Sequence, residues 1–492
     1  MATEIPFDNS YARLPDRFVA RIRPTPVAAP RLIQVNRPLA ETLGIDPGWL
    51  AGPEGTEILA GNAVPRGAEP TAMAYAGHQF GNPVPQLGDG RAILLGEVVG
   101  HDGLRRDIQL KGSGPTPFSR RGDGRAALGP VLREYLVSEA MAALGIKTTR
   151  ALAAALTGEA VIRETRLPGA VLARVAASHI RVGTFQYFAF RGDNEGLRLL
   201  ADHVIARHDP DAAKAERPYA ALLAGIIARQ ADLIARWMLV GFIHGVMNTD
   251  NMTVSGETID YGPCAFMDAY DPGAVFSAID EQGRYAYANQ PRIAQWNLTR
   301  LAETMLPLLS EDVDAAVAEA QELLGAFSPA FQEAFQAGLR AKLGLVTTEA
   351  DDSALARDLM EAMAQHRADF TLTFRRLADC AADPAADPAM AALFEDPAAC
   401  NAWLVRWRER LSREPQGDVS RRDAMRAVNP AFIPRNHRIE AVIVAAVTRD
   451  DFAPFAELLE VLSAPFEDQP GRVSYAEPPR DEERVLQTFC GT

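Results

Sequence analysis

The sequence predicts an α+β protein with two lobes, a small β-rich lobe followed by a larger helical one. Short apolar runs bounded by glycine predict strands between about residues 88 and 178. From about residue 196, apolar residues recur at helical spacing almost to the end of the chain. We expect an N-terminal extension, a β-rich lobe, a helical lobe, a helical C-terminal region and a polar tail, at residues 1–75, 76–190, 191–310, 311–467 and 468–492.

The composition is that of an acidic globular protein. The chain has 492 residues, 48% of them hydrophobic, and a net charge of −14. This balance argues against general nucleic-acid binding, which depends on basic surface. The most apolar long segment, residues 219–247, is interrupted by Arg229, Asp232 and Arg236 at helical spacing, which indicates a polar stripe on a helix and not a membrane span. The N-terminus lacks the basic and apolar regions of a secretory signal. We therefore expect a soluble cytoplasmic protein that binds neither nucleic acid nor membrane.

The elements of the β-rich lobe can be assigned in order. A short helix is predicted at residues 36–44, with Asn36 as its N-cap, Pro38 in its first turn and Gly44 as its stop. The next elements are a glycine-rich turn with a strand, a second strand, an amphipathic helix and two further strands, at residues 88–99, 105–114, 129–145, 154–164 and 169–178.

The helical part surrounds one conspicuous loop. Two long helical segments precede "HGVMNTDNM", His244 to Met252, and residues 251–262 then predict a short hairpin that turns at Ser255–Glu257. Beyond Asn289 the chain is helical, with turn-rich breaks near residues 383–400. We expect the polar tail from about residue 468 to be loosely ordered.

Several polar residues occur in the order in which a protein-kinase-like site is assembled. The turn Gly88–Arg91 could bring backbone N–H groups close to phosphates. Lys111, on the next strand, could neutralise phosphate charge, and Glu134, on the following helix, could hold that lysine. Each feature alone is common on protein surfaces. Their order, completed by a His-loop-Asn and an Asp-x-Gly, predicts a kinase-like bilobal fold.

The loop departs from a kinase at the catalytic base. A kinase keeps its base at the position of Val246, which cannot accept a proton. Asp250 is the alternative base, although an Asx residue that only structures the loop has the same sequence pattern. Asn251 and Asp260 could each supply one oxygen to Mg²⁺, which prefers such ligands together with phosphate oxygens.

Two arginines favour an active enzyme. Arg174 and Arg181, on either side of "VAASHI", could both point at anions, and a dead kinase would need neither them nor the metal pair. If the α-phosphate of ATP faces the acceptor, the product is an adenylylated hydroxyl and pyrophosphate leaves. An atypical kinase that uses Asp250 as its base, and a non-catalytic ATP-binding pseudokinase scaffold, stay open as alternatives.

The chain resembles the selenoprotein-O family of protein adenylyltransferases almost end to end. The resemblance rests on long segments: "YAGHQFG", "LGDGRA", "LKGSGPTPFSRRGDGRA", "REYLVSEAM", "HGVMNTDNM", "DYGP", "QPRIAQWNL" and "NPAFIPRNH". The family implies a kinase-like fold, a flipped ATP, and Mg²⁺-dependent transfer of AMP to Ser, Thr or Tyr hydroxyls of proteins. UTP with Mn²⁺ is the alternative substrate if the base pocket is loose.

The resemblance also implies residue roles. Asp250 would be the proton acceptor, Asn251 and Asp260 would hold Mg²⁺ or Mn²⁺, and Glu134 would pair with Lys111. The nucleotide would be bound by Gly88, Gly90, Arg91, Lys111, Asp123, Gly124, Arg174, Arg181 and Asp260. Asp123 and Gly124 come from the resemblance alone, because the residues themselves indicate only a loop before a helix.

Cys490 resembles a cysteine or selenocysteine near the C-terminus of the family. In some bacterial relatives this residue pairs with a cysteine just after the Asp-x-Gly segment. Here that region, residues 271–280, reads "DPGAVFSAID" and contains no cysteine. We therefore expect no internal redox pair, and reaction of Cys490 with outside thiols only.

Overall fold

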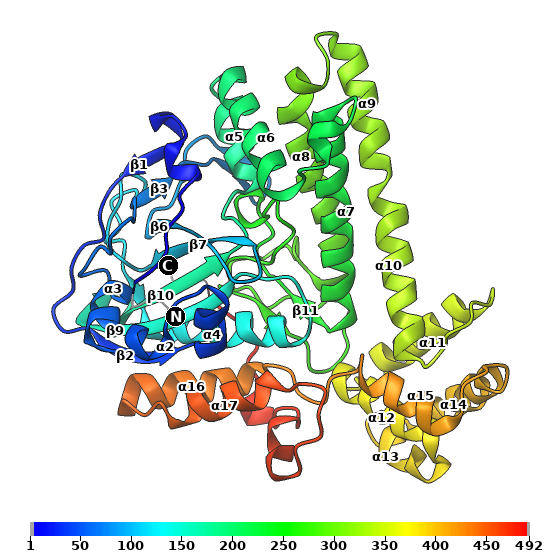
Figure 1. Ribbon diagram of the computed structural model, residues 1–492. Coiled ribbons are helices and arrows are strands. Elements are labelled where there is room, and N and C mark those ends of the chain that lie inside the picture. The colour runs from blue at the N-terminus through cyan, green and yellow to red at the C-terminus, as the bar shows by residue number, and fades with distance from the viewer. Residues whose placement is uncertain (1–3, 490–492) are drawn as a thin grey trace.

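The largest sheet in the computed structural model, which describes residues 4–489, is antiparallel and is formed by the first 176 residues (Figure 1). Its strands follow the order β1-β3-β6-β7-β10-β9-β2, and β8 pairs with β10. The strands are β1 (Val19–Arg21), β3 (Thr71–Met73), β6 (Ala92–Val99), β7 (Arg105–Lys111), β10 (Arg166–Ala176), β9 (Arg150–Ile162), β2 (Arg31–Val35) and β8 (Ala126–Ala127). The α+β class predicted from the sequence is therefore confirmed.

Residues of the expected N-terminal extension contribute β1, β2 and β3 to this sheet. The helices α1 (Arg37–Thr42), α2 (Pro47–Leu50) and α3 (Pro53–Leu59) pack their apolar side chains against one face of it. The predicted cap is present, since the Asn36 side chain accepts a hydrogen bond from the Leu39 N–H at 3.2 Å.

The other face of the sheet is covered by α4 (Leu128–Ala143), which confirms the helix predicted at residues 129–145, although it is buried on nearly all sides and has no solvated polar face. Leu132 and Leu136 of this helix share a buried cluster with Leu172 of β10. These strands lie between two layers of helices, so both of their faces are buried. The sequences of β6, β9 and β10 are therefore continuous apolar runs and do not alternate between apolar and polar residues. The predicted strands at residues 88–99, 105–114, 154–164 and 169–178 are confirmed as β6, β7, β9 and β10.

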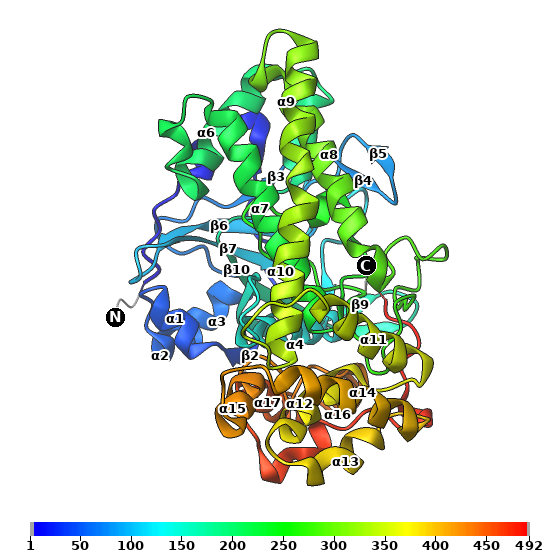
Figure 2. The ribbon, with the colours of Figure 1, turned by 90° about the vertical axis from the view of Figure 1, so that its right-hand side faces the viewer.

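Helices follow the sheet, as predicted. Figure 2 shows the long helix α10 running beside α7 and α8. These central helices are α5 (Val182–Ala189), α6 (Asn194–His208), α7 (Pro218–Leu239), α8 (Gln290–Leu309), α9 (Val313–Gly325) and α10 (Phe327–Lys342). Within residues 4–489, no helix combines the length and the apolar character that a membrane crossing requires.

The C-terminal helices return to the sheet region. The helices after α10 are α11 (Asp352–Gln365), α12 (Phe370–Ala382), α13 (Asp387–Ala391), α14 (Pro397–Leu411), α15 (Asp418–Arg426), α16 (Asn436–Arg449) and α17 (Ala453–Ser463). Both α16 and α17 pack against α4, on the side away from the sheet (Figure 1). The Tyr135 and Phe455 rings meet there edge to face at 5.4 Å.

Two local expectations were wrong. Residues 251–262 form no hairpin, because Thr253 bridges to Arg181 and Thr258 bridges to Thr148 instead of pairing with each other. The tail is also more ordered than expected. It forms short 3₁₀ helices at Pro470–Tyr475 and Asp481–Glu483, and the Thr488 N–H donates to the Phe276 carbonyl at 2.7 Å. Cys490 lies outside the described residues.

Candidate active site

Asp260 lies at the centre of a cluster of three cations. Its Oδ1 accepts from Lys111 Nζ at 2.9 Å and from Arg174 Nη1 at 2.7 Å, and its Oδ2 accepts from Arg181 Nη1 at 2.9 Å. Asp260 has a φ of 63°, a left-handed conformation that aspartate adopts more readily than most non-glycine residues. The three cation contacts hold the carboxylate in this position.

The register of the sheet brings two of these cations together. Arg174 on β10 pairs directly with Gln109 on β7, and Lys111 lies two residues further along β7. Residues two apart on a strand share a face. Lys111 and Arg174 therefore point to the same side, where Arg174 Nη2 donates to Gln109 Oε1 at 2.7 Å.

Glu134 completes the cluster from α4. Its carboxylate accepts from Lys111 Nζ at 2.5 Å and from Arg174 Nη1 at 3.1 Å. Burial raises the pKa of Glu134, but Lys111 and Arg174 outweigh it and leave the pKa below its ordinary value. For Asp260 burial acts in the same direction, and Lys111, Arg174 and Arg181 together hold its pKa well below the ordinary range. Both carboxylates are permanent anions near neutral pH.

Two further residues of this site, Gln109 and Tyr75, escaped the sequence analysis, and the side chain of Asp89, in the turn expected to offer backbone N–H groups, belongs to it as well. Gln109 Nε2 donates to the buried Asp89 carboxylate at 3.0 Å, and the Arg181 guanidinium lies 4.5 Å from the centre of the Tyr75 ring. Asp89 itself lies 3.8 Å from Arg181. The two-residue spacing of Gln109 and Lys111 could have identified Gln109, but no local signal links Tyr75 to an arginine 106 positions later.

Asp250 occupies a different environment. It lies in the 3₁₀ helix η4 (Thr249–Asn251) and is only 8% exposed, and its Oδ1 has no hydrogen-bond partner. Burial raises the pKa of Asp250 to about 6, although the Arg181 charge and a hydrogen bond from Gln79 act against it. Gly77 leaves room for this carboxylate, since a Cβ there would lie 2.5 Å from Oδ1.

The rest of the loop is held by packing. His244 is fully buried, stacks on Trp237 at 5.5 Å between ring centres, and hydrogen-bonds the Ile259 carbonyl at 2.8 Å. It therefore connects the loop to the residue that precedes Asp260. Val246 is buried, and its carbonyl accepts from Asn251 Nδ2 at 3.0 Å, which leaves Asn251 Oδ1 as a possible ligand.

The glycine-rich turn packs against the loop of residues 113–125. Thr116 Oγ1 donates to the Asp89 carbonyl at 2.6 Å, and a Cβ on Gly88 would lie 2.3 Å from the Phe118 ring. Gly124 has a φ of 64° and approaches the Gly114 backbone so closely that a Cβ would lie 2.1 Å from it.

The expected nucleotide residues are not all in one cluster. Lys111, Arg174 and Arg181 all contact Asp260, whereas Asp123 is exposed and pairs with Arg163 at 2.9 Å. Gly88, Gly90 and Arg91 belong to the turn that leads into β6, and the Arg91 carbonyl accepts from the Gly112 N–H at 2.7 Å.

The donor set fits a magnesium ion that takes its other ligands from a substrate. Within residues 4–489, no three His, Cys, Asp or Glu side chains group as metal ligands do. Asp260 uses three of its roughly four acceptor positions on cations, so about one remains. One carboxylate oxygen and the Asn251 amide oxygen, together with phosphate and water oxygens, are the ligands that Mg²⁺ commonly takes at nucleotide sites.

Comparison with known proteins identifies the family. A family model described as protein adenylyltransferase SelO matches residues 2–463. The protein nucleotidyltransferase YdiU of Bradyrhizobium diazoefficiens is 70% identical over 492 residues, which cover 100% of both chains. Proteins of the same name from Rhodopseudomonas palustris and Methylorubrum extorquens are 68% and 67% identical, also over the full length of both chains. The chain therefore belongs to the SelO family of protein adenylyltransferases and is a nucleotidyltransferase.

Proposed function

We propose that this protein transfers AMP from ATP to Ser, Thr or Tyr hydroxyls of other proteins and releases pyrophosphate. The observation that carries the proposal is Asp250, a buried carboxyl with a pKa of about 6 beside a cluster of cations, in a loop whose usual base position is Val246. The family description and the names of the relatives support it.

The cation cluster would bind the phosphates. The three positive charges of Lys111, Arg174 and Arg181 exceed the two negative charges of Asp260 and Glu134, so the cluster stays positive and would offset part of the charge on a leaving pyrophosphate. A flipped ATP would place its β- and γ-phosphates on these residues and turn its α-phosphate to the acceptor. The turn and loop residues Gly88, Gly90, Arg91, Asp123 and Gly124 would contact the rest of the nucleotide.

The order of these parts supports a kinase-like bilobal arrangement. A glycine turn, a strand lysine, a helix glutamate, and a loop with Asn251 and Asp260 follow one another as in a kinase. The structure has the Lys111–Glu134 pair that this order requires. In this arrangement Glu134 keeps Lys111 extended toward the phosphates, so that the ammonium group is already in position when the nucleotide binds.

The reaction would be an in-line displacement at the α-phosphorus. The acceptor hydroxyl gives its proton to Asp250, and its oxygen forms a bond to the α-phosphorus. The bond from that phosphorus to the oxygen that bridges to the β-phosphorus breaks, and pyrophosphate leaves with the electron pair. A base with a pKa near 6 is ionised at neutral pH and still basic enough to accept a proton. A magnesium or manganese ion, held by Asn251 and Asp260, would neutralise phosphate charge.

Two other functions use the same residues. An atypical kinase would employ Asp250 as base on the γ-phosphate, and a pseudokinase scaffold would bind ATP without turnover. UTP with Mn²⁺ could replace ATP in a related uridylyl transfer. An adenylyltransferase moves the α-phosphorus and releases pyrophosphate, whereas a kinase moves the γ-phosphorus and releases ADP, so the position of the transferred phosphorus decides between them.

The test uses ATP labelled at either the α- or the γ-phosphate, with Mg²⁺ and a mixed protein extract as acceptor. Wild type and Asp260→Ala are compared. We expect label from the α-phosphate only, and its loss in the variant. Label from the γ-phosphate only would establish a kinase, and ATP binding without any label would establish the scaffold.

A further inference from the structure

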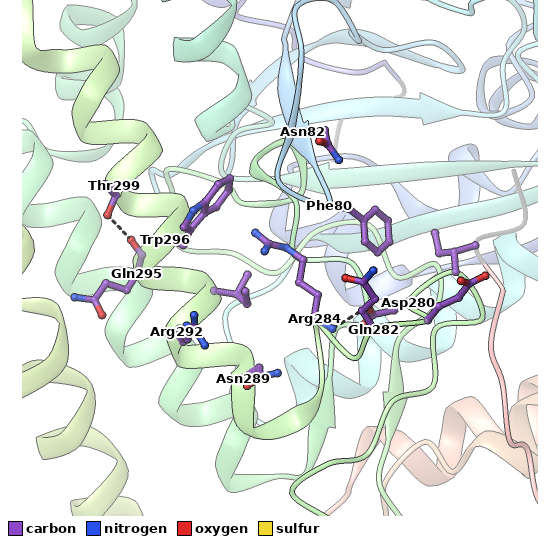
Figure 3. A pocket seen from close by; sticks show the side chains of 13 residues that line it. Phe80, Asn82, Asp280, Gln282, Arg284, Asn289, Arg292, Gln295, Trp296 and Thr299 are labelled. Atoms are coloured by element: carbon purple, nitrogen blue, oxygen red, sulfur yellow. Dashed lines mark hydrogen bonds between the residues drawn. The ribbon is translucent and has the colours of Figure 1, made fainter.

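A pocket of 790 Å³ opens beside the proposed active site, between the β4–β5 hairpin, the loop of residues 279–284 and the first turns of α8 (Figure 3). We propose that this pocket binds the segment of the acceptor protein that flanks the modified hydroxyl, and that it selects an acidic side chain in that segment. The inference rests on the proposed transfer to protein hydroxyls. The volume of the pocket lies in the range of roughly 300–1,000 Å³ that specific ligand sites occupy.

The loop that carries Asp250 also anchors two walls of the pocket, through Asn248. β4 (Gly77–Gln79) and β5 (Asn82–Val84) form the hairpin, and its tip residue Phe80 donates its N–H to Asn248 Oδ1 at 3.0 Å. From the opposite wall, Tyr285 Oη donates to the same oxygen at 2.6 Å. Asn248 lies two residues before Asp250, and an extended chain advances about 3.3 Å per residue. A peptide whose hydroxyl faces Asp250 therefore reaches the pocket within a few residues.

Arg284 is prepared to receive a carboxylate. Its guanidinium carbon lies 4.9 Å from the Trp296 ring centre and 5.6 Å from that of Tyr285. Figure 3 shows this side chain crossing the middle of the pocket. Within residues 4–489, neither Arg284 nor Arg292 forms an ion pair with a carboxylate, and the buried Arg284 Nε has no acceptor. A planar guanidinium fixed by aromatic rings matches a carboxylate through two parallel hydrogen bonds.

The start of α8 adds to this positive character. Arg292 lies in the first turn of the helix, and that turn contains no acidic residue. The N-terminus of a helix favours an anion because its free N–H groups carry partial positive charge. Asp280 does not cancel this charge in the pocket, since it is 5% exposed and its carboxylate accepts from the backbone N–H groups of Arg284 and Tyr285.

An aromatic ring is placed in the pocket against the local backbone preference. Phe80 and Gly81 have φ values of 51° and 85°, as a two-residue hairpin turn requires, but such turns favour asparagine or aspartate before the glycine. A phenylalanine in this conformation costs about 1 kcal/mol. Its ring meets Tyr285 edge to face at 5.1 Å, and Ile279 nearby is 55% exposed. The pocket thus offers apolar contacts beside two arginines that form no ion pair with a carboxylate. Glu281 also lines the pocket, but it is exposed and the two arginines outnumber it, which suits an extended acidic segment.

The experiment measures acceptor preference. A peptide library with one fixed hydroxyl residue and randomised flanks, together with a mixed protein extract, is labelled from α-labelled ATP. We compare wild type with Arg292→Glu, Arg284→Lys, which keeps the charge but loses the planar fork, and Arg449→Glu. Arg449 is an exposed arginine at the end of α16 and serves as the charge-matched control. The Kd for ATP is measured for each variant, because a folding or nucleotide defect would change it.

We expect wild type and Arg449→Glu to prefer Asp or Glu at one or two flanking positions. Arg284→Lys should lower kcat/KM for acidic peptides about tenfold, and Arg292→Glu should shift the preference toward Lys or Arg. Flank preferences and extract labelling that are equal in wild type, Arg284→Lys and Arg292→Glu would overturn the inference and leave the proposed function standing. Absence of α-label with wild type in every acceptor would instead overturn the proposed function, and the inference with it.

Discussion

Asp250 and Asp260 are ten residues apart, and their surroundings give them opposite properties. Asp260 contacts Lys111, Arg174 and Arg181, and these cations hold its pKa well below the ordinary range. Asp250 has one oxygen without a partner, and burial raises its pKa to about 6. The same residue type is thus a permanent anion at one position and a carboxyl with a pKa closer to neutral pH at the other, a separation that many acid–base enzymes use.

Arg181 shows how this difference is built. Its Nη1 donates to Asp260 Oδ2 at 2.9 Å, but toward Asp250 it donates to the backbone carbonyl at 2.8 Å. The Asp250 side chain therefore receives the charge of Arg181 only at a distance. Arg181 can therefore pair directly with the first carboxylate, together with Lys111 and Arg174, and still leave the second one basic, as the proposed transfer requires.

Removing Asp260 should have the largest effect. Asp260→Ala leaves Lys111, Arg174 and Arg181 without their shared anion and would delete the carboxylate ligand of the proposed metal ion. Several kcal/mol of charge stabilisation correspond to a loss of transfer of at least about 10³-fold. The measurement is the rate of labelling from α-labelled ATP at saturating nucleotide. Labelling within about tenfold of wild type would refute the assignment of Asp260.

Asp450→Ala is the matched control for this variant. Asp450 also has a left-handed backbone, with a φ of 54°, and also pairs with an arginine, Arg31, but it is exposed at the end of α16. It thus reproduces the change in backbone preference and the loss of one ion pair. We expect its transfer rate to equal that of wild type.

Asp250→Asn removes the proposed base and leaves Asp260 unchanged. A general base contributes about 10²–10⁴-fold to a rate, so we expect a loss of at least about 10²-fold, with the Kd for ATP retained. The base must be ionised to act. Wild-type kcat/KM should therefore fall as the pH drops below about 6 and level off above it, and the residual activity of the variant should lack this step.

The matched variant here is Val246→Asp, which restores the carboxylate at the kinase position. An enzyme that uses Asp250 should gain nothing from it, and label from γ-labelled ATP should not appear. A pH profile in Asp250→Asn that still steps near pH 6 would assign the titration to another group and remove the main support for Asp250 as the base.

The stability of Asp250→Asn tests the raised pKa of Asp250 without measuring catalysis. The pKa of Asp250 is higher in the folded than in the unfolded state. The free energy of unfolding therefore falls as the pH rises from about 4 to 6, and the whole of this loss is present above pH 6. A shift of about two units corresponds to about 3 kcal/mol. The variant, which removes this charge, should be more stable than wild type at pH 7.5 by up to that amount and equal to it at pH 4. Denaturant unfolding at both pH values measures the difference, and an equal gain at both would contradict the prediction.

The sequence predicted those parts of the site that depend on local patterns. Residues of β7 and α4 follow strand and helix periods, so Lys111 and Glu134 could be placed on neighbouring elements, and the structure shows them in contact. Gln109 lies on the same face of β7 as Lys111 and was within reach of the same argument.

Contacts between distant segments could not be predicted in this way. Thr258 pairs with Thr148 and the Tyr75 ring lies against Arg181, although neither segment carries a signal for the other. The hairpin expected at residues 251–262 failed for this reason, since its two flanks form bridges to other parts of the chain. The order of Thr488 likewise depends on a carbonyl more than 200 positions earlier.

Glu134→Gln should have the smallest effect and tests whether the cluster acts as one unit. The variant keeps the size of the side chain but loses its charge, while Asp260 still holds Lys111 at 2.9 Å. We expect a loss of transfer of about tenfold, the size of one charge-assisted hydrogen bond. If Glu134 acts by positioning Lys111, the same substitution in a Lys111→Met background should lower the residual rate by much less. Equal losses in both backgrounds would mean that Glu134 acts through Arg174, its other partner at 3.1 Å, and that the Lys111 pair contributes nothing to transfer.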